Sequence, residues 1–398
     1  MDQVTDKPGA GRSFSQGMSS ITCYENEIPD FVEAELARLH GHIFSSLVQF
    51  KTYDGLEGAS TYVARSDRDA ITAILLFQRD GGTVRVLNQG IPIENDELCR
   101  FARTIFSRYA LVDAISFYAV RSAVHRMPYP YQQFNCSDDY VLTLPRTAEA
   151  YLASLGRTTR KNIKYYLNKL RRHFPSFHYS VYGNADVDEH TVRSIIAFNR
   201  ARMIGKNKVP GINEEEERRI LELAKACGFI GVITIENQIC AGVIGYRVGQ
   251  NYFMSVIAHD SRYNGYSIGI MCCYLTICEC IARGCKEFHF LWGRYDYKFN
   301  LGAVRHGLNV LVLYRSRLRL FLNGGMALRI ACNGLMQQVK SSLLVNGIKG
   351  NQGNNGNNGN NGNSHDSSSF VSTLAFHLIK TLRSLKRLSP GHPAEGDK

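Results

Sequence analysis

The chain has 398 residues, of which 44% are hydrophobic and 21% are charged, and its formal net charge is +12. This composition excludes a protein that is disordered throughout, and it is sufficient for the cores of two or three domains. The positive charge favours phosphate-bearing partners, namely an anionic cofactor, a nucleotide-linked sugar, RNA or an anionic membrane surface. A soluble basic protein without an anionic ligand is the alternative.

The 11 cysteines are expected in a reducing compartment, because the N-terminus lacks the apolar core of a secretory signal. Five of them lie between Cys272 and Cys285 without the paired C-x2-C spacing of a zinc site. We interpret these five as small buried hydrophobic residues and expect no metal. The longest apolar stretch, residues 268–282, carries Glu279 and is shorter than the ~20 residues that span a bilayer. We therefore expect no transmembrane helix and a cytoplasmic protein, with a peripheral position at the inner face of the membrane as a further option.

The first part of the chain predicts a flexible leader and then a mixed unit. Residues 1–24 are rich in Gly, Ser and polar side chains, which is typical of a flexible segment. Over residues 25–143 the hydrophobic periodicity alternates between that of a strand and that of a helix. Helices are predicted at 29–40 and 94–109, and strands at 61–65, 70–77, 83–87 and 114–120.

A second unit, residues 144–316, repeats this order after several helices. Helices are predicted at 148–155, 158–174, 188–203, 214–227 and 267–283, and strands at 228–235, 239–248, 252–258, 287–292 and 308–314. Turn signals at Glu236-Asn237 and Gly249-Gln250 separate three of the strands, which predicts an antiparallel meander. The whole pattern indicates an α+β fold.

The last part of the chain has a different character. Residues 317–345 predict a helical extension, and residues 346–369 form an Asn, Gly and Ser-rich linker. Residues 370–390 place leucines at helical spacing and cations late in the segment, which predicts an amphipathic basic helix. Such a helix suits a membrane surface or a groove on a partner protein; docking on its own domain is the alternative.

One candidate anion site is the turn between the strand 252–258 and the helix 267–283. Free backbone N–H groups and the positive end of the helix dipole point out of such a turn. Gly265 and Gly269 would allow a phosphate to approach the backbone closely, and Arg262 could add a formal charge. The position of this turn after a meander and before an apolar helix supports the interpretation more than its glycines do.

A second candidate is the helix 157–172, which contains seven cations and no acidic residue. Acidic residues normally interleave with cations on a solvated helix face, so their absence favours a role toward an anion. An ordinary solvated face is the alternative. The cations that fall away from the apolar stripe are Arg157, Arg160, Lys161, Lys164 and Arg171.

The third candidate is the stretch F-H-F-L-W-G-R-Y-D-Y-K-F-N, residues 288–300. Gly293 would end a strand, so Asp296 and Lys298 would lie at the mouth of a cleft with Tyr295 and Tyr297 as its walls. An exposed turn with solvated charges is the alternative, although three aromatic residues are unusual there. His259 and His289 lie nearby and could act as bases, but a single histidine beside a strand is more often structural.

These stretches together resemble the GNAT acyltransferase superfamily, and within it the CelD-like and FemAB-like branch associated with exopolysaccharide, cellulose and cell-wall synthesis. A basic R-x-x-R-x-x-I-x6-L helix ahead of the core and a Gly-x-x-x-Tyr-Lys segment after it are typical of that branch. The matching residues are Arg157, Arg160, Ile163 and Leu170 in the first motif and Gly293, Tyr297 and Lys298 in the second. The resemblance covers residues 140–315 well and residues 25–140 faintly. Where the superfamily has R/Q-x-x-G-x-G/A, this chain has Arg262, Gly265 and Ser267, so it departs at the last position.

The resemblance implies two tandem GNAT-like domains, a degenerate one at 25–143 and an acyl-CoA-binding one at 144–316, each a mixed, largely antiparallel sheet flanked by helices. It implies direct transfer of an acyl group, such as acetyl, from acyl-CoA to an amine or hydroxyl of a sugar, lipid-linked or amino acceptor, without a covalent enzyme intermediate. The implied acyl-CoA-binding residues are Val256, Ile257, Ala258, Arg262, Gly265, Tyr266, Ser267 and Gly269. The implied catalytic residues are Asp296, Lys298 and Tyr297. Asp296 would be the base, and Lys298 would either stabilise developing negative charge at the thioester oxygen or hold a phosphate on the acceptor. The implied acceptor-binding residues are Arg157, Arg160, Lys161, Lys164 and Arg294.

Two other functions stay open. Relatives of the FemAB type suggest peptidyl transfer from aminoacyl-tRNA, which the basic helix would suit, whereas the acyl-CoA interpretation expects no nucleic acid partner. A non-catalytic GNAT-like scaffold, which recruits partners of a polysaccharide-synthesis complex through residues 370–390, is the third interpretation.

Overall fold

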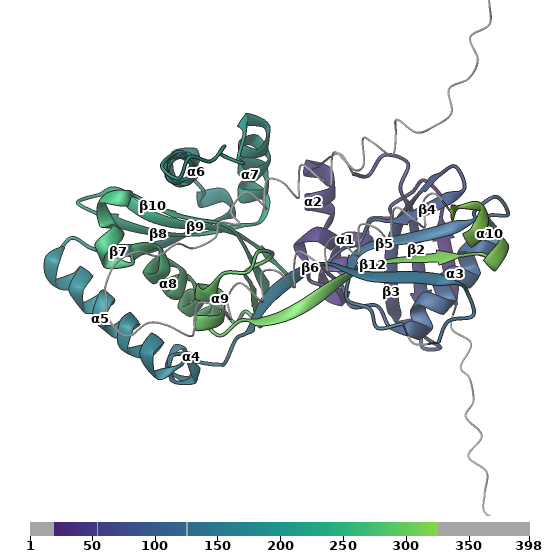
Figure 1. The fold of residues 1–398 in the computed structure, drawn as a ribbon, viewed down its shortest axis with the longest axis horizontal. Helices are drawn as coiled ribbons and strands as arrows, with labels where there is room; N and C mark the ends of the chain where they lie inside the picture. The colour runs from purple at the N-terminus through teal and green to yellow at the C-terminus, as the bar shows by residue number, and fades with distance from the viewer. Residues whose placement is uncertain (1–19, 54, 125, 325–398) are drawn as a thin grey trace, which may run out of the picture.

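The computed structural model describes residues 20–53, 55–124 and 126–324, and its main feature is a single 12-stranded sheet (Figure 1). The strand order is β1-β2-β3-β4-β5-β12-β6-β11-β10-β9-β8-β7. The first half of the described chain contains β1 (Ile21–Tyr24), α1 (Val32–Leu39), the 3-10 helix η1 (Ile43–Ser45), α2 (Leu47–Thr52), β2 (Ser60–Arg65), β3 (Ile71–Asp80), β4 (Thr83–Val86), α3 (Asn95–Arg108) and β5 (Ala114–Val120).

The second half contains more helix. Its elements are β6 (Tyr131–Thr143), α4 (Ala148–Ser154), α5 (Arg157–His173), β7 (His178–Gly183), η2 (Asn184–Asp186), α6 (Glu189–Ile204), α7 (Glu214–Cys227), β8 (Gly228–Ile235), β9 (Gln238–Val248), β10 (Asn251–His259), η3 (Ser261–Tyr266), α8 (Ile268–Ala282), β11 (Glu287–His289), α9 (Asp296–Asn300), β12 (Val304–Tyr314) and α10 (Arg317–Leu322).

The two halves share one strand arrangement, as the sequence predicts. In each half, three antiparallel strands precede a helix and a strand that pairs parallel with the third. These series are β2-β3-β4-α3-β5 and β8-β9-β10-α8-β11. The α+β class and the largely antiparallel sheet are therefore confirmed.

Two long strands join the halves. β6 and β12 pair antiparallel from Val304–Leu313 against Tyr131–Val141. The outer edge of β12 pairs with β5, while the end of β6 pairs with β11. Figure 1 shows this ribbon running from one lobe into the other. The predicted boundary between residues 143 and 144 coincides with the end of β6, but the sheet does not break there.

Several expected elements need correction. The leader prediction is wrong for Ile21–Tyr24, which pairs with β2; residues 1–19 lie outside the described chain. The sequence also fails to reveal β6, because its middle, Q-Q-F-N-C-S-D-D, lacks the apolar alternation of a half-buried strand. β11 is shorter than the predicted 287–292, since Leu291 adopts a left-handed conformation (φ 54°) that ends the ladder.

Helices cover both faces of the second half. α6 and α7 lie on one face of β8–β10, and α4, α5, α8 and α9 lie on the other (Figure 1). α8 is apolar all round and is buried by both the sheet and α4–α5, as expected for a central helix. Cys272, Cys273, Cys280 and Cys285 are buried and Cys278 is partly buried, which confirms the interpretation of these thiols as packing residues.

Most of the predictions for the C-terminal part of the chain concern residues outside the described ones. α10 begins the predicted extension 317–345, whereas the rest of that extension from 325, the linker 346–369 and the basic helix 370–390 lie outside the described residues. Among the described helices, none has the length and hydropathy that a membrane span requires.

Candidate functional site

The site is built where β10 and β11 diverge. The two strands pair in parallel only from Asn251–Phe253 against Glu287–His289. β10 then continues to His259, with a bulge between Met254 and Val256, and pairs with β9 alone. On its other side, the backbone of Met254–Ala258 pairs with no strand of the described chain, so its polar groups are available to a ligand. This segment contains Val256, Ile257 and Ala258, which the resemblance implies as acyl-CoA-binding residues.

Side chains on this part of β10 are packing groups. Val256 and Ala258 are buried against α6 and α7, and Ile257 packs toward α8 on the opposite face. Any contact of these three residues with a ligand would therefore be through the backbone.

The turn after β10 has the form of an anion site. η3 leads to Ser267, which lies in the left-handed region (φ 50°, ψ 31°) and makes no side-chain cap bond to α8. The first N–H groups of a helix have no partner within it, and the helix dipole adds positive potential there. Gly265 has open space where a side chain would be, as predicted. Gly269 does not, because an added Cβ would lie 2.8 Å from Nδ1 of His259; its missing side chain serves the packing of α8 against β10.

Arg262 carries its own counter-ion. Its guanidinium bonds Asp260 at 2.6 Å, while the Arg262 side chain remains 67% exposed. The hydrogen bond from Arg262 lowers the pKa of Asp260, so the pair is charged at neutral pH. Arg262 can still reach a ligand, but the pair adds no net charge to the turn.

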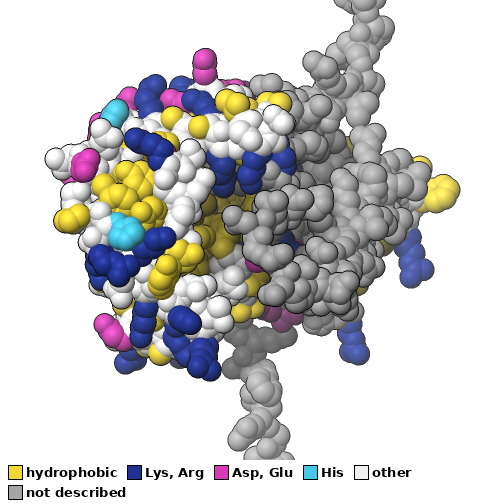
Figure 2. Space-filling view, turned by 60° about the vertical axis from the view of Figure 1, so that its left-hand side comes forward, with side chains coloured by type: hydrophobic (Ala, Val, Ile, Leu, Met, Phe, Trp, Pro, Cys, Tyr) yellow, Lys and Arg dark blue, Asp and Glu magenta, His cyan; other side chains and the backbone are white. Residues whose placement is uncertain are grey.

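The basic helix and the turn, separate in the sequence, lie side by side. Lys169 Nζ donates to the carbonyl of Gly265 at 3.1 Å, and His173 Nδ1 lies 3.1 Å from the hydroxyl of Tyr266. Lys169 and His173 were not predicted as site residues; their i, i+4 spacing on one helix face is the signal that could have revealed them. Figure 2, which brings this half forward, shows Lys and Arg side chains gathered around an apolar area.

Four of the five predicted acceptor-binding cations lie on the first half of α5, whereas the turn contacts Lys169 and His173 near the end of that helix. Arg157, Lys161 and Lys164 are exposed. Arg160 has a structural task, since its Nη1 donates to the carbonyls of Ala153 and Leu155 at 2.7 and 2.8 Å.

Lys298 is not at a cleft mouth but buried, with 2% exposure. Its Nζ donates to the carbonyls of Phe290, Leu291 and Trp292 at 2.9, 3.0 and 2.6 Å. Three acceptors match the three N–H bonds of the ammonium. Burial opposes the charge and lowers the pKa of Lys298 to about 7. The expected contact of Lys298 with a thioester oxygen is therefore corrected: in this structure it holds the loop 290–292.

The other residues of this stretch stay accessible in part. Asp296 begins α9 and is exposed, as is Arg294, so both can meet a ligand. Tyr297 is half-buried, and burial raises its pKa well above the usual value, so it keeps its proton. Trp292 is 7% exposed and stacks on Phe44 with ring centres 4.6 Å apart.

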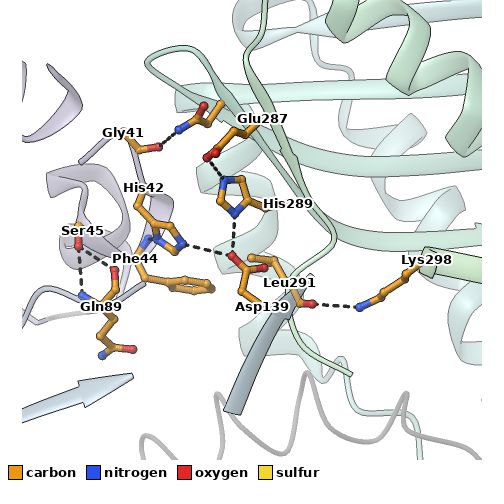
Figure 3. Close-up of polar contacts among 11 residues, drawn as sticks. Gly41, His42, Phe44, Ser45, Gln89, Asp139, Glu287, His289, Leu291 and Lys298 are labelled. Carbon is orange, nitrogen blue, oxygen red and sulfur yellow. Dashed lines mark hydrogen bonds and ion pairs between the residues drawn. The ribbon is translucent and has the colours of Figure 1, made fainter. Parts of the chain in front are cut away.

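A buried polar network, which the sequence does not reveal, lies on the opposite face of these strands (Figure 3). His289 lies between two carboxylates, with Nδ1 2.7 Å from Asp139 Oδ2 and Nε2 3.2 Å from Glu287 Oε2. His42 Nε2 faces the same Asp139 oxygen at 3.9 Å. Burial disfavours a charged His289, but the bonds to Asp139 and Glu287 outweigh it and raise the pKa. For His42, burial prevails and lowers the pKa to about 4.

His42, Asp139 and His289 also have the composition of a metal-ligand set, with ligand atoms within 4.8 Å of one another. Their bonding argues against that use. The backbone N–H of Phe44 donates to Nδ1 of His42, so the proton of the neutral ring is on Nε2 and points at Asp139. A metal at Nε2 would require the opposite tautomer. We therefore interpret the cluster as a buried polar network, in which His289 bonds two carboxylates and His42 faces Asp139.

Comparison with known proteins gives one family match and several similar folds. Residues 157–299 match the family described as acetyltransferase (GNAT) domain. FemX has a similar fold, with a TM-score of 0.55 and 9% identity over 76% of this chain and 99% of FemX. L-PGS from Bacillus licheniformis has a TM-score of 0.44 and 13% identity over 78% of this chain and 99% of that one. A tandem GNAT protein from the clavulanic acid biosynthesis pathway has a TM-score of 0.35 and 8% identity over 74% and 98%. No curated protein matches the sequence significantly.

Residues 157–299 thus match a GNAT acetyltransferase domain, and the fold of the chain is similar to that of FemX. The domain match agrees with the resemblance to the GNAT superfamily.

Proposed function

We propose that the protein transfers an acyl group from acyl-CoA directly to an amine or hydroxyl of a sugar, lipid-linked or amino acceptor, in polysaccharide or cell-envelope synthesis. One observation carries this proposal. The strand edge Met254–Ala258, which no described strand covers, leads into the uncapped N-terminus of α8, so one continuous surface offers backbone groups to a thioester arm and then to its phosphates.

The turn residues 262–269 hold the pyrophosphate in this proposal. Backbone N–H groups at the start of α8 supply most of the attraction, with Lys169 and Arg262 as nearby cations. The backbone of Met254–Ala258 aligns the arm, so that the thioester lies where β11 has ended. Positioning of donor and acceptor supplies most of the rate acceleration in such a reaction.

The chemical step needs a proton acceptor. In our proposal the Asp296 carboxylate takes the proton of the acceptor N–H or O–H, whose lone pair then attacks the thioester carbonyl carbon. The C–S bond breaks, and the CoA thiolate leaves with its electron pair and takes up a proton. Arg294 and Tyr297, on the same short segment, face the acceptor. Lys298 acts indirectly, by holding the loop 290–292 that precedes this segment.

Two measurements test the proposal. Acetyl-CoA should raise the apparent stability of the full chain in a concentration-dependent thermal shift, since it binds only the folded state. Asp296→Asn should lower kcat at least 100-fold and leave acetyl-CoA binding intact, because loss of a general base typically costs 10²–10⁴-fold. Near-normal turnover of Asp296→Asn would contradict the role of Asp296 as the base. The absence of any thermal shift with acyl-CoA thioesters would contradict acyl-CoA as the donor.

Transfer from aminoacyl-tRNA is a second candidate, which the fold similarity to FemX and the exposed cations Arg157, Lys161 and Lys164 favour. RNA binding would weaken steeply with added salt, because phosphate contacts release counterions. A non-catalytic scaffold is the third. Deletion of residues 346–398 separates it from the enzyme, since a core that still consumes acyl-CoA makes those residues a localisation device for a membrane or a protein partner.

A further inference from the structure

The first lobe reaches the point where β10 and β11 diverge through the segment 41–46. The carbonyl of Gly41 accepts a bond from Asn251 Nδ2 at 3.1 Å, at the start of β10. The ring of His42 packs edge-on against Phe253, with ring centres 4.8 Å apart. Phe253 is the last residue of β10 that pairs with β11. Residues of the first lobe therefore lie directly against the last paired rung before the strands part.

The same segment holds the chain that leaves β11. Phe44 stacks on Trp292, with an angle of 23° between the rings. From the opposite side, Lys298 binds the carbonyls of residues 290–292. Leu291, between the Phe44–Trp292 stack and the Lys298 bonds, adopts a left-handed conformation, which a leucine keeps only when its surroundings impose it. The loop 290–292 is thus fixed by two lobes at once.

The polar network links the two lobes at the same place. His42 comes from the first lobe, Asp139 from the bridging strand β6, and His289 from β11 immediately before the loop (Figure 3). His42 is 3% exposed and His289 is 1% exposed, so neither touches a substrate directly. The Asp139 carboxylate is hydrogen-bonded to His289 and faces Nε2 of His42 at 3.9 Å, so the buried charge constrains the orientation of both rings.

We propose that the first lobe is a working part of the reaction site, and that His42 and Phe44 are positioning residues which hold the loop 290–292 in the geometry that acyl transfer requires. This inference rests on the proposed function, because it places that loop beside the reacting thioester. Tyr53 of α2, which donates to Glu216 of α7 at 2.8 Å, anchors the segment to the second lobe without touching the loop.

The test uses Trp292, the only tryptophan of the chain, in the full-length protein without ligand. Phe44→Leu should shift the emission of Trp292 and raise its acrylamide quenching at least twofold, and Phe44→Tyr should restore both. Phe31→Leu is the matched control, because Phe31 belongs to the same lobe but packs on Tyr24; it should change neither signal.

Steady-state kinetics then distinguish a positioning role of Phe44 and His42 from a role in protein stability alone. Phe44→Leu and His42→Leu should lower kcat about tenfold with the KM for acyl-CoA within twofold of the wild type, since the phosphate-binding turn is elsewhere. His42→Gln, whose amide N–H can face Asp139 as Nε2 of His42 does, should recover most of the activity.

A folded Phe44→Leu protein with unchanged Trp292 emission, quenching and kcat would overturn the inference. If that variant does not fold, unchanged Trp292 signals and kcat in folded His42→Leu would overturn it equally. If the wild type transfers no acyl group, the Trp292 measurements still decide whether the first lobe holds the loop, so the two failures are distinguishable.

Discussion

Addition of one methyl group at Gly90 should disrupt the His42 network far more than the same change at a comparable glycine. Gly90 follows β4 in a left-handed conformation (φ 73°), and an alanine Cβ there would lie 2.0 Å from Cε1 and 2.2 Å from Nε2 of His42. Carbon atoms in contact normally lie 3.5–4.0 Å apart, so the ring would have to move. It has little room, because Phe253 and His289 pack on it with ring centres 4.8 and 5.4 Å away.

The magnitude follows from two contributions. A left-handed backbone costs a non-glycine residue about 1–2 kcal/mol. Overpacking of a buried site adds about 1–3 kcal/mol. Gly90→Ala should therefore lower the free energy of unfolding by about 2–5 kcal/mol under these two estimates. Gly81 has a similar φ of 54° and no atom within 4 Å of an added Cβ, so Gly81→Ala should show only the first contribution.

Urea unfolding, followed by far-UV circular dichroism and by Trp292 emission, measures both variants under one condition. The difference between them should be about 1–3 kcal/mol, and Trp292 emission of the folded state should change in Gly90→Ala alone. Equal losses in the two variants would refute the packing argument, because the backbone cost would then account for everything.

Three further predictions concern the same region. Lys298→Met should lower the free energy of unfolding by about 4.5 kcal/mol, the low end for three bonds from a charged donor at about 1.5–3 kcal/mol each. Lys161→Met on exposed α5 is the control, and equal urea midpoints of the two variants would contradict a stabilising role of the three Lys298 bonds. The two histidines should give a stability maximum near pH 6–7. The unfolded state protonates His42 at its ordinary pKa of 6.5 and the folded state at about 4, so stability falls as pH drops through that window. His289, with a raised pKa, loses its contribution as pH rises through its folded pKa. His42→Gln should flatten only the acidic side of a series of urea midpoints, and an unchanged acidic side would contradict this assignment. Lys169→Ala should raise the KM for acyl-CoA about three- to tenfold with kcat unchanged, whereas Lys161→Ala should leave this KM unchanged. Identical KM values in the two variants would contradict a contact between Lys169 and the phosphates of acyl-CoA.

Much of the fold is readable from local patterns. The meander 228–258 and the helix that follows it are correctly predicted, because their strands are continuous apolar runs bounded by Gly and Asn turns. The repeated order of strands and helix in the first lobe is predicted for the same reason. β6 could not be predicted, since a strand whose polar middle serves as a bridge between lobes carries no hydrophobic alternation.

The candidate site is predictable only in its separate pieces. The uncapped turn before α8 and the cation-rich α5 are visible in the sequence, because helix ends and charge runs are local features. Their contact through Lys169 and Gly265, which are 96 positions apart, is not local. The charged segment at 294–298 suggested the rim of a cleft. The ammonium of Lys298 points inward instead, because the three carbonyls of residues 290–292, at the end of β11, accept its hydrogen bonds.

The sequence by itself therefore determined the α+β class, the repeated strand order and the position of the turn before α8, all of which depend on periodicity and on short-range backbone chemistry. Only the tertiary structure decided that His42, Asp139 and His289 meet. These residues come from a 3-10 helix of the first lobe and from two strands that are neighbours in the sheet. Their partnership depends on which strands pair and in what register, and no local pattern encodes either.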